Sequence, residues 1–328
     1  MIKIGILGCG RIGQVHAATI MRLANVQLVA VSDFVDDAAQ ALAAKTGASV
    51  QTTDDIIGNS DIDAVIIGTP TDTHYDIIHA AAKAGKAIFC EKPVDMSADR
   101  IRDCMDVVAA NDTPFMTAFN RRFDPNFAHL QARIVEGVIG NVEIVTILSR
   151  DPNPPPVSYI TSSGGIFRDM MIHDFDMARF LLGEEPVTVF AVGSALVDPE
   201  IGAAGDVDTA AVTLTTESGK ICQISNSRRA TYGYDQRIEV HGSKGMLRAE
   251  NQRENTVEIA TADGFRTAPA QHFFLERYEA AYRAELLQFI SALEKGAAQS
   301  PSITDGLRAQ MLADAAAQSL ESGLPVAL

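Results

Sequence analysis

The first 120 residues of the chain repeat one pattern, in which a short continuous apolar run is followed by a segment with helical periodicity. The apolar runs are IKIGILG, VQLVAVSD, DAVIIGTP and AIFC, and PFMTAF closes the series. Candidate helices lie between them at residues 11–24, 36–46, 73–84 and 98–110. Continuous apolar strands separated by helices of this length indicate a parallel sheet covered on both faces. The pattern therefore predicts an α/β domain with a doubly wound sheet.

The character of the sequence changes after Arg122. Successive β-rich runs extend from Pro186 to about Ile259, with turn signals at ESGK, TYGY and GSKG that favour antiparallel strands. Further candidate helices lie near residues 125–136, 167–182, 275–294 and 303–321. We expect two domains, a dinucleotide-binding Rossmann domain at 1–120 and an α+β domain with a large, mostly antiparallel open sheet at 121–328.

Composition excludes several classes of protein. The 328 residues carry a formal net charge of −15, which opposes binding to nucleic acid phosphates. No apolar run is long enough to cross a bilayer, and no signal segment precedes the first strand-like run, so we expect a cytoplasmic protein without a membrane partner. The four cysteines are widely spaced, which favours buried thiols over a zinc site or disulfides.

The segment ILGCGRIGQVH contains the pattern G-x-G-x-x-G at the point where the first strand ends and the first helix begins. Gly8 would permit a tight turn, Gly10 would let a pyrophosphate approach the backbone, and Gly13 would allow close packing of the helix. Arg11 and Ile12 lie within the same loop. This context at the start of a strand–turn–helix unit indicates dinucleotide binding.

Asp33 ends the second apolar run, twenty residues after Gly13. A carboxylate at this position would accept hydrogen bonds from an adenosine ribose and repel a 2′-phosphate, which favours NAD over NADP. Asp33 could instead cap the helix that follows, as could Asp36 or Asp37.

Lys92 follows the apolar run AIFC, at the carboxyl end of an expected parallel strand. An ammonium group beside apolar surface is costly unless it reaches water or serves a site. Open α/β sheets bind their ligands at this edge, so Lys92 occupies a position suited to a functional residue.

Four segments, GILGCGRIG, IIGTPTDTH, FCEKP and GGIFRDMMIHDFDMARFLLG, together resemble the Gfo/Idh/MocA family of nicotinamide-dependent sugar and polyol dehydrogenases. The resemblance covers essentially the full chain. It places Thr69, Pro70, His74 and Glu91 beside the cofactor and implies that Lys92, Asp169 and His173 form the catalytic group. The bond between Lys92 and Pro93 is often cis in this family.

Asp169 and His173 are four residues apart, so on one helix they would share a face, with Asp176 close to the same stripe. Histidine suits proton exchange near neutral pH, which makes His173 the candidate base. Two other interpretations remain for these residues. His173 could be a helix histidine in a buried seam and Asp169 a partner of Arg168 or Arg179, or Asp169, His173 and Asp176 could bind a metal ion. We expect no metal, since a nicotinamide accepts the hydride without one.

The segments FNRRFD, SRDP, DMMIHDFDMARF and YGYD resemble the inositol-oxidising branch of this family. The resemblance implies oxidation of myo-inositol at C2 with NAD, with Arg122, Asp151 and Tyr234 lining the polyol site, and it implies a homotetramer. Asp151 stands where some members carry asparagine, which leaves the stereoisomer open. Arg122 could instead form a structural salt bridge, Asp151 a turn and Tyr234 part of the core.

Two other functions fit the same residues. The substrate could be another inositol isomer or a pyranose sugar, since the same catalytic group would serve either. The chain could also be a sensor that binds the dinucleotide without catalysis, although such a protein would have no need for Lys92, Asp169 and His173.

Overall fold

The computed structural model describes residues 1–328, which divide into two compact units. The first unit comprises residues 1–120 and 281–310, and the second comprises residues 121–280 and 311–328. Each unit has its own sheet.

The first unit contains a six-stranded parallel sheet in the order β3–β2–β1–β4–β5–β6. Its central strands are apolar on both faces, because helices cover both, and every residue of β4 and β5 is buried. This strand order and the parallel pairing are those of a Rossmann fold, as the sequence predicts. The strands are β1 (Ile2–Leu7), β2 (Val26–Ser32), β3 (Ser49–Val50), β4 (Ala64–Ile67), β5 (Ala87–Cys90) and β6 (Phe115–Thr117).

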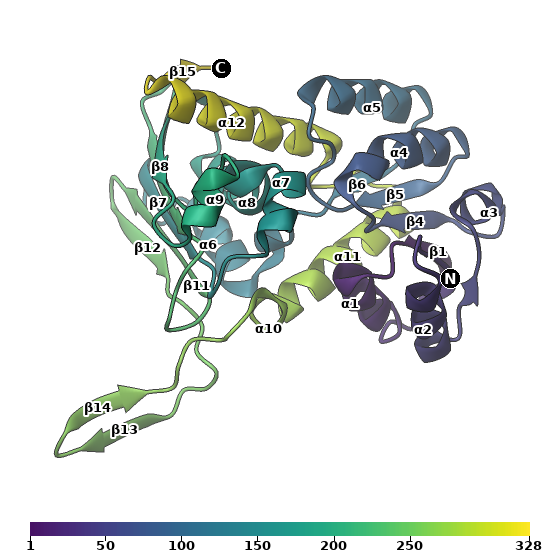
Figure 1. The fold of residues 1–328 in the computed structure, drawn as a ribbon, viewed down its shortest axis with the longest axis horizontal. Coiled ribbons are helices and arrows are strands. Elements are labelled where there is room, and N and C mark those ends of the chain that lie inside the picture. The colour runs from purple at the N-terminus through teal and green to yellow at the C-terminus, as the bar shows by residue number, and fades with distance from the viewer. The chain divides into compact units, whose positions relative to one another are not determined.

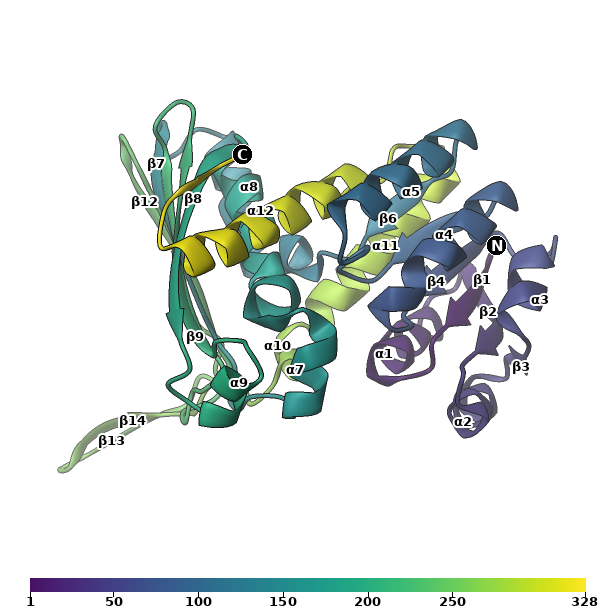
Figure 2. The same ribbon diagram turned by 45° about the horizontal axis from the view of Figure 1, so that its top comes forward.

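Helices alternate with these strands along the chain, and α4 and α5 lie side by side in both views (Figures 1 and 2). They are α1 (Arg11–Ile20), α2 (Asp36–Thr46), α3 (Thr53–Gly58), η1 (Thr71–Thr73), α4 (His74–Lys83) and α5 (Ala98–Ala110). The segment 281–310 returns to the first unit after the second unit has been traversed, and we call it the returning segment. Two later helices, α11 (Glu279–Lys295) and α12 (Ile303–Ser322), begin near or within it.

The second unit contains a seven-stranded sheet in the order β12–β11–β7–β10–β9–β8–β15. All neighbouring strands are antiparallel except β10 and β7, so the sheet is mostly antiparallel, as the sequence predicts. The strands are β7 (Val142–Arg150), β8 (Pro186–Ser194), β9 (Thr209–Thr216), β10 (Ile221–Ser227), β11 (Asp235–Gly242), β12 (Gly245–Ala249) and β15 (Val326–Ala327).

Side chains alternate along these strands between a buried and a more exposed face. In β9, Ala210, Val212 and Leu214 are buried, whereas the residues between them are not. Helix α8 lies against the sheet on one side, and no helix of the unit covers the opposite side (Figure 2). The sheet is therefore open on one face.

The remaining helices of the second unit lie between or beside its strands in the sequence. They are η2 (Asn120–Phe123), α6 (Pro125–Val135), α7 (Val157–Ser163), η3 (Ile166–Met170), α8 (Ile172–Leu182), α9 (Pro199–Ala203) and α10 (Phe274–Arg277). Asp124 caps α6, since its carboxylate accepts hydrogen bonds from the N–H groups of Asn126 and Phe127 at 3.1 Å. A separate hairpin of β13 (Glu258–Thr261) and β14 (Gly264–Thr267) extends away from the sheet (Figure 1).

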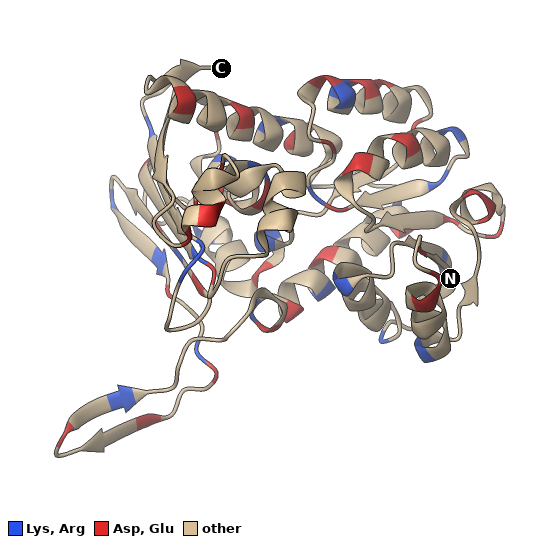
Figure 3. Cartoon of the chain, in the orientation of Figure 1, with Lys and Arg blue, Asp and Glu red and all other residues tan.

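Acidic side chains occur on many helices of both units (Figure 3), in keeping with the net charge of −15. None of the helices combines the length and the apolar character that crossing a membrane requires.

Candidate functional site

The glycine loop between β1 and α1 is built so that two of its glycines cannot be replaced. Gly8 has φ of +97°, and a Cβ there would lie 2.5 Å from the backbone of Gly68. A Cβ on Gly13 would lie 2.0 Å from the carbonyl oxygen of Gly8. The turn and the close approach of α1 to β1 therefore both require glycine.

The N-terminus of α1 is suited to an anionic ligand. Gly10 is its N-cap residue, no side chain caps the helix, and its first turn has no acidic residue. A Cβ on Gly10 would meet nothing within 4 Å, so there is space beside the backbone. Arg11 is exposed and Ile12 is half-buried at the same turn. Backbone N–H groups and the helix dipole would together attract the pyrophosphate of a dinucleotide.

Asp33 lies just beyond β2 and connects this strand to the glycine loop. Its Oδ2 accepts a hydrogen bond from the N–H of Cys9 at 2.6 Å, and its Oδ1 accepts one from Val35 at 2.8 Å. Burial and the charge of Asp33 raise the pKa of the Cys9 thiol to about 11. Val35 is the N-cap of α2 and no side chain caps that helix, so the alternative of Asp33 as a helix cap is wrong.

His74 connects the loop after β4 to the segment after β5. The buried ring has Nε2 at 2.9 Å from the carbonyl oxygen of Thr69 and Nδ1 at 3.0 Å from that of Pro93. Burial lowers the pKa of His74 despite these carbonyl groups, so we assign a neutral ring that donates to one carbonyl at a time. Pro70 is exposed and Thr69 half-buried at the same edge of the sheet.

Lys92 lies two residues beyond β5 and is half-buried. The Lys92–Pro93 peptide bond is cis, as the family resemblance implies. The preceding residue, Glu91, has its Oε1 at 2.8 Å from Nε2 of His16, a fully buried residue of α1. His16 was not among the residues expected from the sequence, although it lies within the segment ILGCGRIGQVH. The carboxyl edge of this sheet thus carries every residue that was expected to bind the cofactor.

The expected single helix over residues 167–182 is wrong. Residues Ile166–Met170 form a π-helical turn, and α8 begins only at Ile172. Gly164 and Gly165 precede the turn with φ of +81° and +78°, and the carboxylate of Asp206 accepts hydrogen bonds from the N–H of Ile166 at 3.1 and 3.2 Å. Asp169 and His173 therefore do not share a regular helix, and their spacing does not by itself align them.

Asp169 is held by two side chains from other elements. Its Oδ2 lies 3.3 and 3.4 Å from the guanidinium nitrogens of Arg228, and its Oδ1 accepts a hydrogen bond from the hydroxyl of Tyr159 at 3.1 Å. The expected structural partners Arg168 and Arg179 bind other acids. Arg228 was not among the residues expected from the sequence, because its contact with Asp169 joins positions 59 residues apart.

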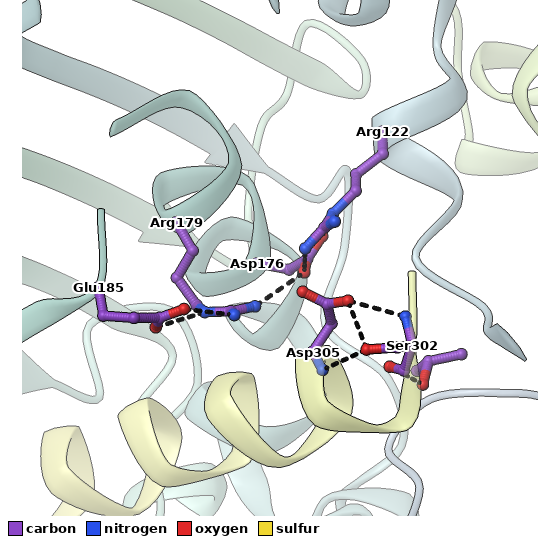
Figure 4. Close-up of polar contacts among 7 residues, drawn as sticks. Arg122, Asp176, Arg179, Glu185, Ser302 and Asp305 are labelled. Carbon is purple, nitrogen blue, oxygen red and sulfur yellow. Dashed lines mark hydrogen bonds and ion pairs between the residues drawn. The ribbon is translucent and has the colours of Figure 1, made fainter. Parts of the chain in front are cut away.

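Arg122 forms a bidentate ion pair with Asp176, at 2.8 and 2.6 Å (Figure 4). The guanidinium also lies over the ring of Phe180, 4.9 Å from its centroid. Asp176 is buried and has Arg179 as a second partner at 3.6 Å, while Arg179 forms a further pair with Glu185 (Figure 4). The salt-bridge interpretation of Arg122 is thus realised within the second unit, and this pairing fixes the direction of its side chain.

Asp151 and Tyr234 lie next to strands of the same sheet. Asp151 follows β7, and its N–H donates to the carbonyl of Ser227 at 3.0 Å. Burial raises the pKa of Asp151 to about 6. Tyr234 is 4% exposed and meets the edge of the Tyr278 ring with centroids 6.0 Å apart, so it packs in an aromatic cluster.

No group of three or more histidine, cysteine, aspartate or glutamate side chains in the chain is placed to hold a metal ion. The proposed metal face at Asp169, His173 and Asp176 is therefore not assembled, because arginines take up both carboxylates.

Comparison with known proteins assigns both parts of the chain to one family. Residues 2–119 match the Gfo/Idh/MocA profile described as an oxidoreductase family with an NAD-binding Rossmann fold, and residues 131–328 match the profile of its C-terminal alpha/beta domain. An inositol 2-dehydrogenase of Rhizobium meliloti is 58% identical over 319 residues, covering 97% of each chain.

Two solved structures extend this similarity. A myo-inositol dehydrogenase from Corynebacterium glutamicum is 44% identical with a TM-score of 0.96, covering 100% of this chain and 99% of that one. A scyllo-inositol dehydrogenase from Lactobacillus casei, solved with NAD(H) and scyllo-inositol bound, is 30% identical with a TM-score of 0.93 over 100% and 99% of the two chains.

Proposed function

Because the chain belongs to the Gfo/Idh/MocA oxidoreductase family and its N-terminal part is an NAD-binding Rossmann domain, we propose that it is an NAD-dependent inositol 2-dehydrogenase. The reaction is the oxidation of myo-inositol at C2 to 2-keto-myo-inositol. The observation that carries this proposal is the similarity to an inositol 2-dehydrogenase along nearly the whole of both chains.

The residues at the carboxyl edge of the first sheet fit NAD. Gly8 and Gly13 permit the tight turn and the close approach of α1, and Gly10 leaves space beside the backbone at the N-terminus of this helix, where Arg11 and Ile12 also lie. Asp33 would accept from the adenosine ribose and exclude a 2′-phosphate. The neighbouring residues of the cofactor site are Thr69, Pro70, His74, Glu91 and Lys92. NAD, when bound, accepts the hydride that leaves the substrate carbon.

Three side chains share the proton chemistry in this proposal. His173 takes the proton of the reacting hydroxyl, and Lys92 donates a hydrogen bond to the hydroxyl oxygen as negative charge develops on that oxygen. Asp169 fixes the orientation of the substrate hydroxyl or of the neighbouring cation. The contacts of Asp169 with Arg228 and Tyr159 support this positioning role, because they hold the carboxylate from two sides.

A polyol also needs many directional hydrogen bonds, since hydroxyl groups buried without partners forfeit binding energy. We assign this task to Arg122, Asp151 and Tyr234 in addition to the catalytic group. Asp151 is acidic at a position where some members of the family carry asparagine. The protonation state of Asp151 therefore bears on which inositol isomer is preferred.

The second candidate function is a dehydrogenase of another inositol isomer, which the similarity to a scyllo-inositol dehydrogenase favours. A pyranose dehydrogenase is a further alternative, since it would use the same catalytic group. The last alternative is a sensor that binds NAD without turnover. We further propose a cytoplasmic homotetramer, in which the open face of the seven-stranded sheet contacts other subunits.

The substrate is tested by following the absorbance of reduced nicotinamide with purified protein, NAD and a panel of cyclitols and sugars. Preference for myo-inositol over scyllo-inositol, chiro-inositol, glucose and xylose supports the proposal. Preference for another member of the panel would replace the substrate and keep the mechanism. NAD binding without turnover on any of them would favour the sensor.

The catalytic assignment is tested with Lys92→Ala. We expect the rate of turnover to fall by at least about 100-fold, because a donor to developing negative charge is lost. NAD binding should be retained, and Lys83→Ala, which removes an exposed lysine of α4, is the control for both measurements. Equal rates for the two variants would contradict a catalytic role for Lys92.

A further inference from the structure

Arg228 is a buried arginine that follows β10 and lies beside the carboxylate of Asp169. Its side chain is 1% exposed, and its two terminal nitrogens lie 3.4 and 3.3 Å from Oδ2 of Asp169. Its backbone N–H donates to the carbonyl of Asp208 at 2.8 Å, next to the start of β9. The backbone of Arg228 is therefore anchored by the sheet, and its guanidinium lies against Asp169.

Two further carboxylates experience the same guanidinium. Burial is the largest cause that raises the pKa of Asp151 and of Asp206, and Asp169 raises both pKa values further. Arg228 lowers both. One cation thus contacts Asp169 and favours the ionised form of Asp151 and Asp206, and the three acids come from the end of β7, the π-helical turn and the loop before β9.

Other charged groups do not replace Arg228 in this cluster. Arg121 also lowers the pKa of Asp151, but it is committed to a buried ion pair with Asp174. Asp174 itself raises the pKa of Asp151. A further titratable neighbour is the hydroxyl of Tyr159, which donates to Asp169. Arg228 therefore contacts Asp169 directly and is the cation that favours the ionised form of both Asp151 and Asp206.

The pairing of Arg228 is poor as a purely stabilising contact. Both contacts to Asp169 are longer than 3.2 Å, and the buried Nε has no hydrogen-bond partner. A buried donor without a partner is destabilising, and buried ion pairs contribute little net stability. An apolar residue would fit a core better, so the arginine calls for a functional reason.

We propose that Arg228 is a positioning residue, which holds Asp169 in one orientation and supplies the compensating charge for Asp151, Asp169 and Asp206. Asp206 in turn binds the N–H of Ile166 at the start of the turn that carries Asp169. Arg228 therefore acts on Asp169 both directly and through the turn. This inference rests on the proposed function, since it takes Asp169 as part of the catalytic group.

The electrostatic part is tested without turnover, by a carboxyl carbon NMR titration of Asp151 in the full chain. We expect Arg228→Met to raise the midpoint of this titration by about one pH unit or more, because a cation that favours the carboxylate is removed. Arg229→Met is the matched control, since Arg229 is the exposed neighbour, and should leave the midpoint unchanged. Equal midpoints in the two variants would overturn the proposal.

The positioning part is tested by kinetics on the preferred cyclitol. We expect Arg228→Met to lower kcat by about 10- to 100-fold through misplacement of Asp169, to shift the acid limb of the pH profile upward and to leave NAD affinity unchanged. If wild-type protein turns over no substrate while the NMR shift is present, the proposed function fails and the electrostatic inference stands.

Arg228→Lys keeps the charge but loses the planar fork, and it carries the test if the methionine variant does not fold. We expect the Asp151 midpoint of this variant to stay near that of the wild type while kcat falls. A kcat equal to that of Arg229→Met would contradict the positioning role.

Discussion

At the residue scale, the acids of the second unit differ in what sets their protonation. Asp174 and Asp176 each bind an arginine directly. Burial is the largest cause that raises the pKa of both Asp174 and Asp151, but the first opposing charge is Arg121 for Asp174 and Arg228 for Asp151, whose pKa rises from 3.8 to about 6. Near neutral pH this carboxyl group is therefore ionised at a cost in free energy, and it gains a proton under mildly acidic conditions.

The sign of this effect predicts how Asp151→Asn changes stability. Between pH 3.8 and about 6 the folded protein holds a proton on Asp151 that the unfolded chain releases, so stability falls as pH rises through this window. The asparagine variant lacks this loss, and at pH 7.5 we expect it to be more stable by about 1–3 kcal/mol. Thermal unfolding of both proteins at pH 4 and at pH 7.5 measures the difference. A gain in stability of the same size at both pH values would contradict a raised pKa of Asp151 in the folded protein.

At the element scale, the strand–helix alternation of the first unit could be predicted because each long element carries its own periodic pattern. The short elements β3 and α3 were missed, since two and six residues are too few to show a period. The π-helical turn could not be predicted from local pattern either. It depends on Asp206, whose carboxylate approaches Ile166 from forty positions along the chain.

The same limit applies to the site residues. The glycine loop, Asp33 and Lys92 could be singled out as candidates because their positions relative to strand ends follow a known geometry. Arg228 and His16 carried no such signal, because each acts through a contact with a residue distant in sequence, Asp169 and Glu91 respectively.

The turn that carries Asp169 is sensitive to one added methyl group. Gly165 has φ of +78°, and a Cβ there would lie 2.6 Å from Oδ1 of Asp206. We expect Gly165→Ala to displace this carboxylate from Ile166, lower kcat and lower the stability by more than the roughly 1–2 kcal/mol of a left-handed alanine. Thermal unfolding and steady-state kinetics measure both effects.

Gly183→Ala separates backbone strain from the contact with Asp206. Gly183 ends α8 with φ of +63°, and a Cβ there meets nothing within 4 Å. The stability of this control should fall only by the roughly 1–2 kcal/mol that a left-handed alanine costs, and its kcat should not change. If both variants lose stability and activity equally, Asp206 does not anchor the turn.

At the scale of the whole molecule, the first unit is completed by a segment distant in the sequence. Phe289 of α11 meets the edge of the Phe89 ring with centroids 5.5 Å apart, and Tyr282 meets His16 at 6.2 Å. Thr117 donates its N–H to the carbonyl of Pro301 at 2.9 Å. Residues 281–310 thus contribute to the core of the Rossmann domain, which a reading of consecutive patterns could not predict.

This completion predicts that residues 1–120 alone do not form a stable NAD-binding domain. Losing the burial of Phe289 and its neighbours removes about 1.5–3 kcal/mol for each large apolar side chain, against a total stability of about 5–15 kcal/mol for a domain. A fusion of residues 1–120 to residues 281–310 through a flexible linker should recover cooperative unfolding and NAD binding, measured by circular dichroism and calorimetry. The same fusion with Phe289→Ser is the control and should unfold at lower temperature. Full NAD affinity in the fragment of residues 1–120 would show instead that the returning segment covers a domain that is already complete.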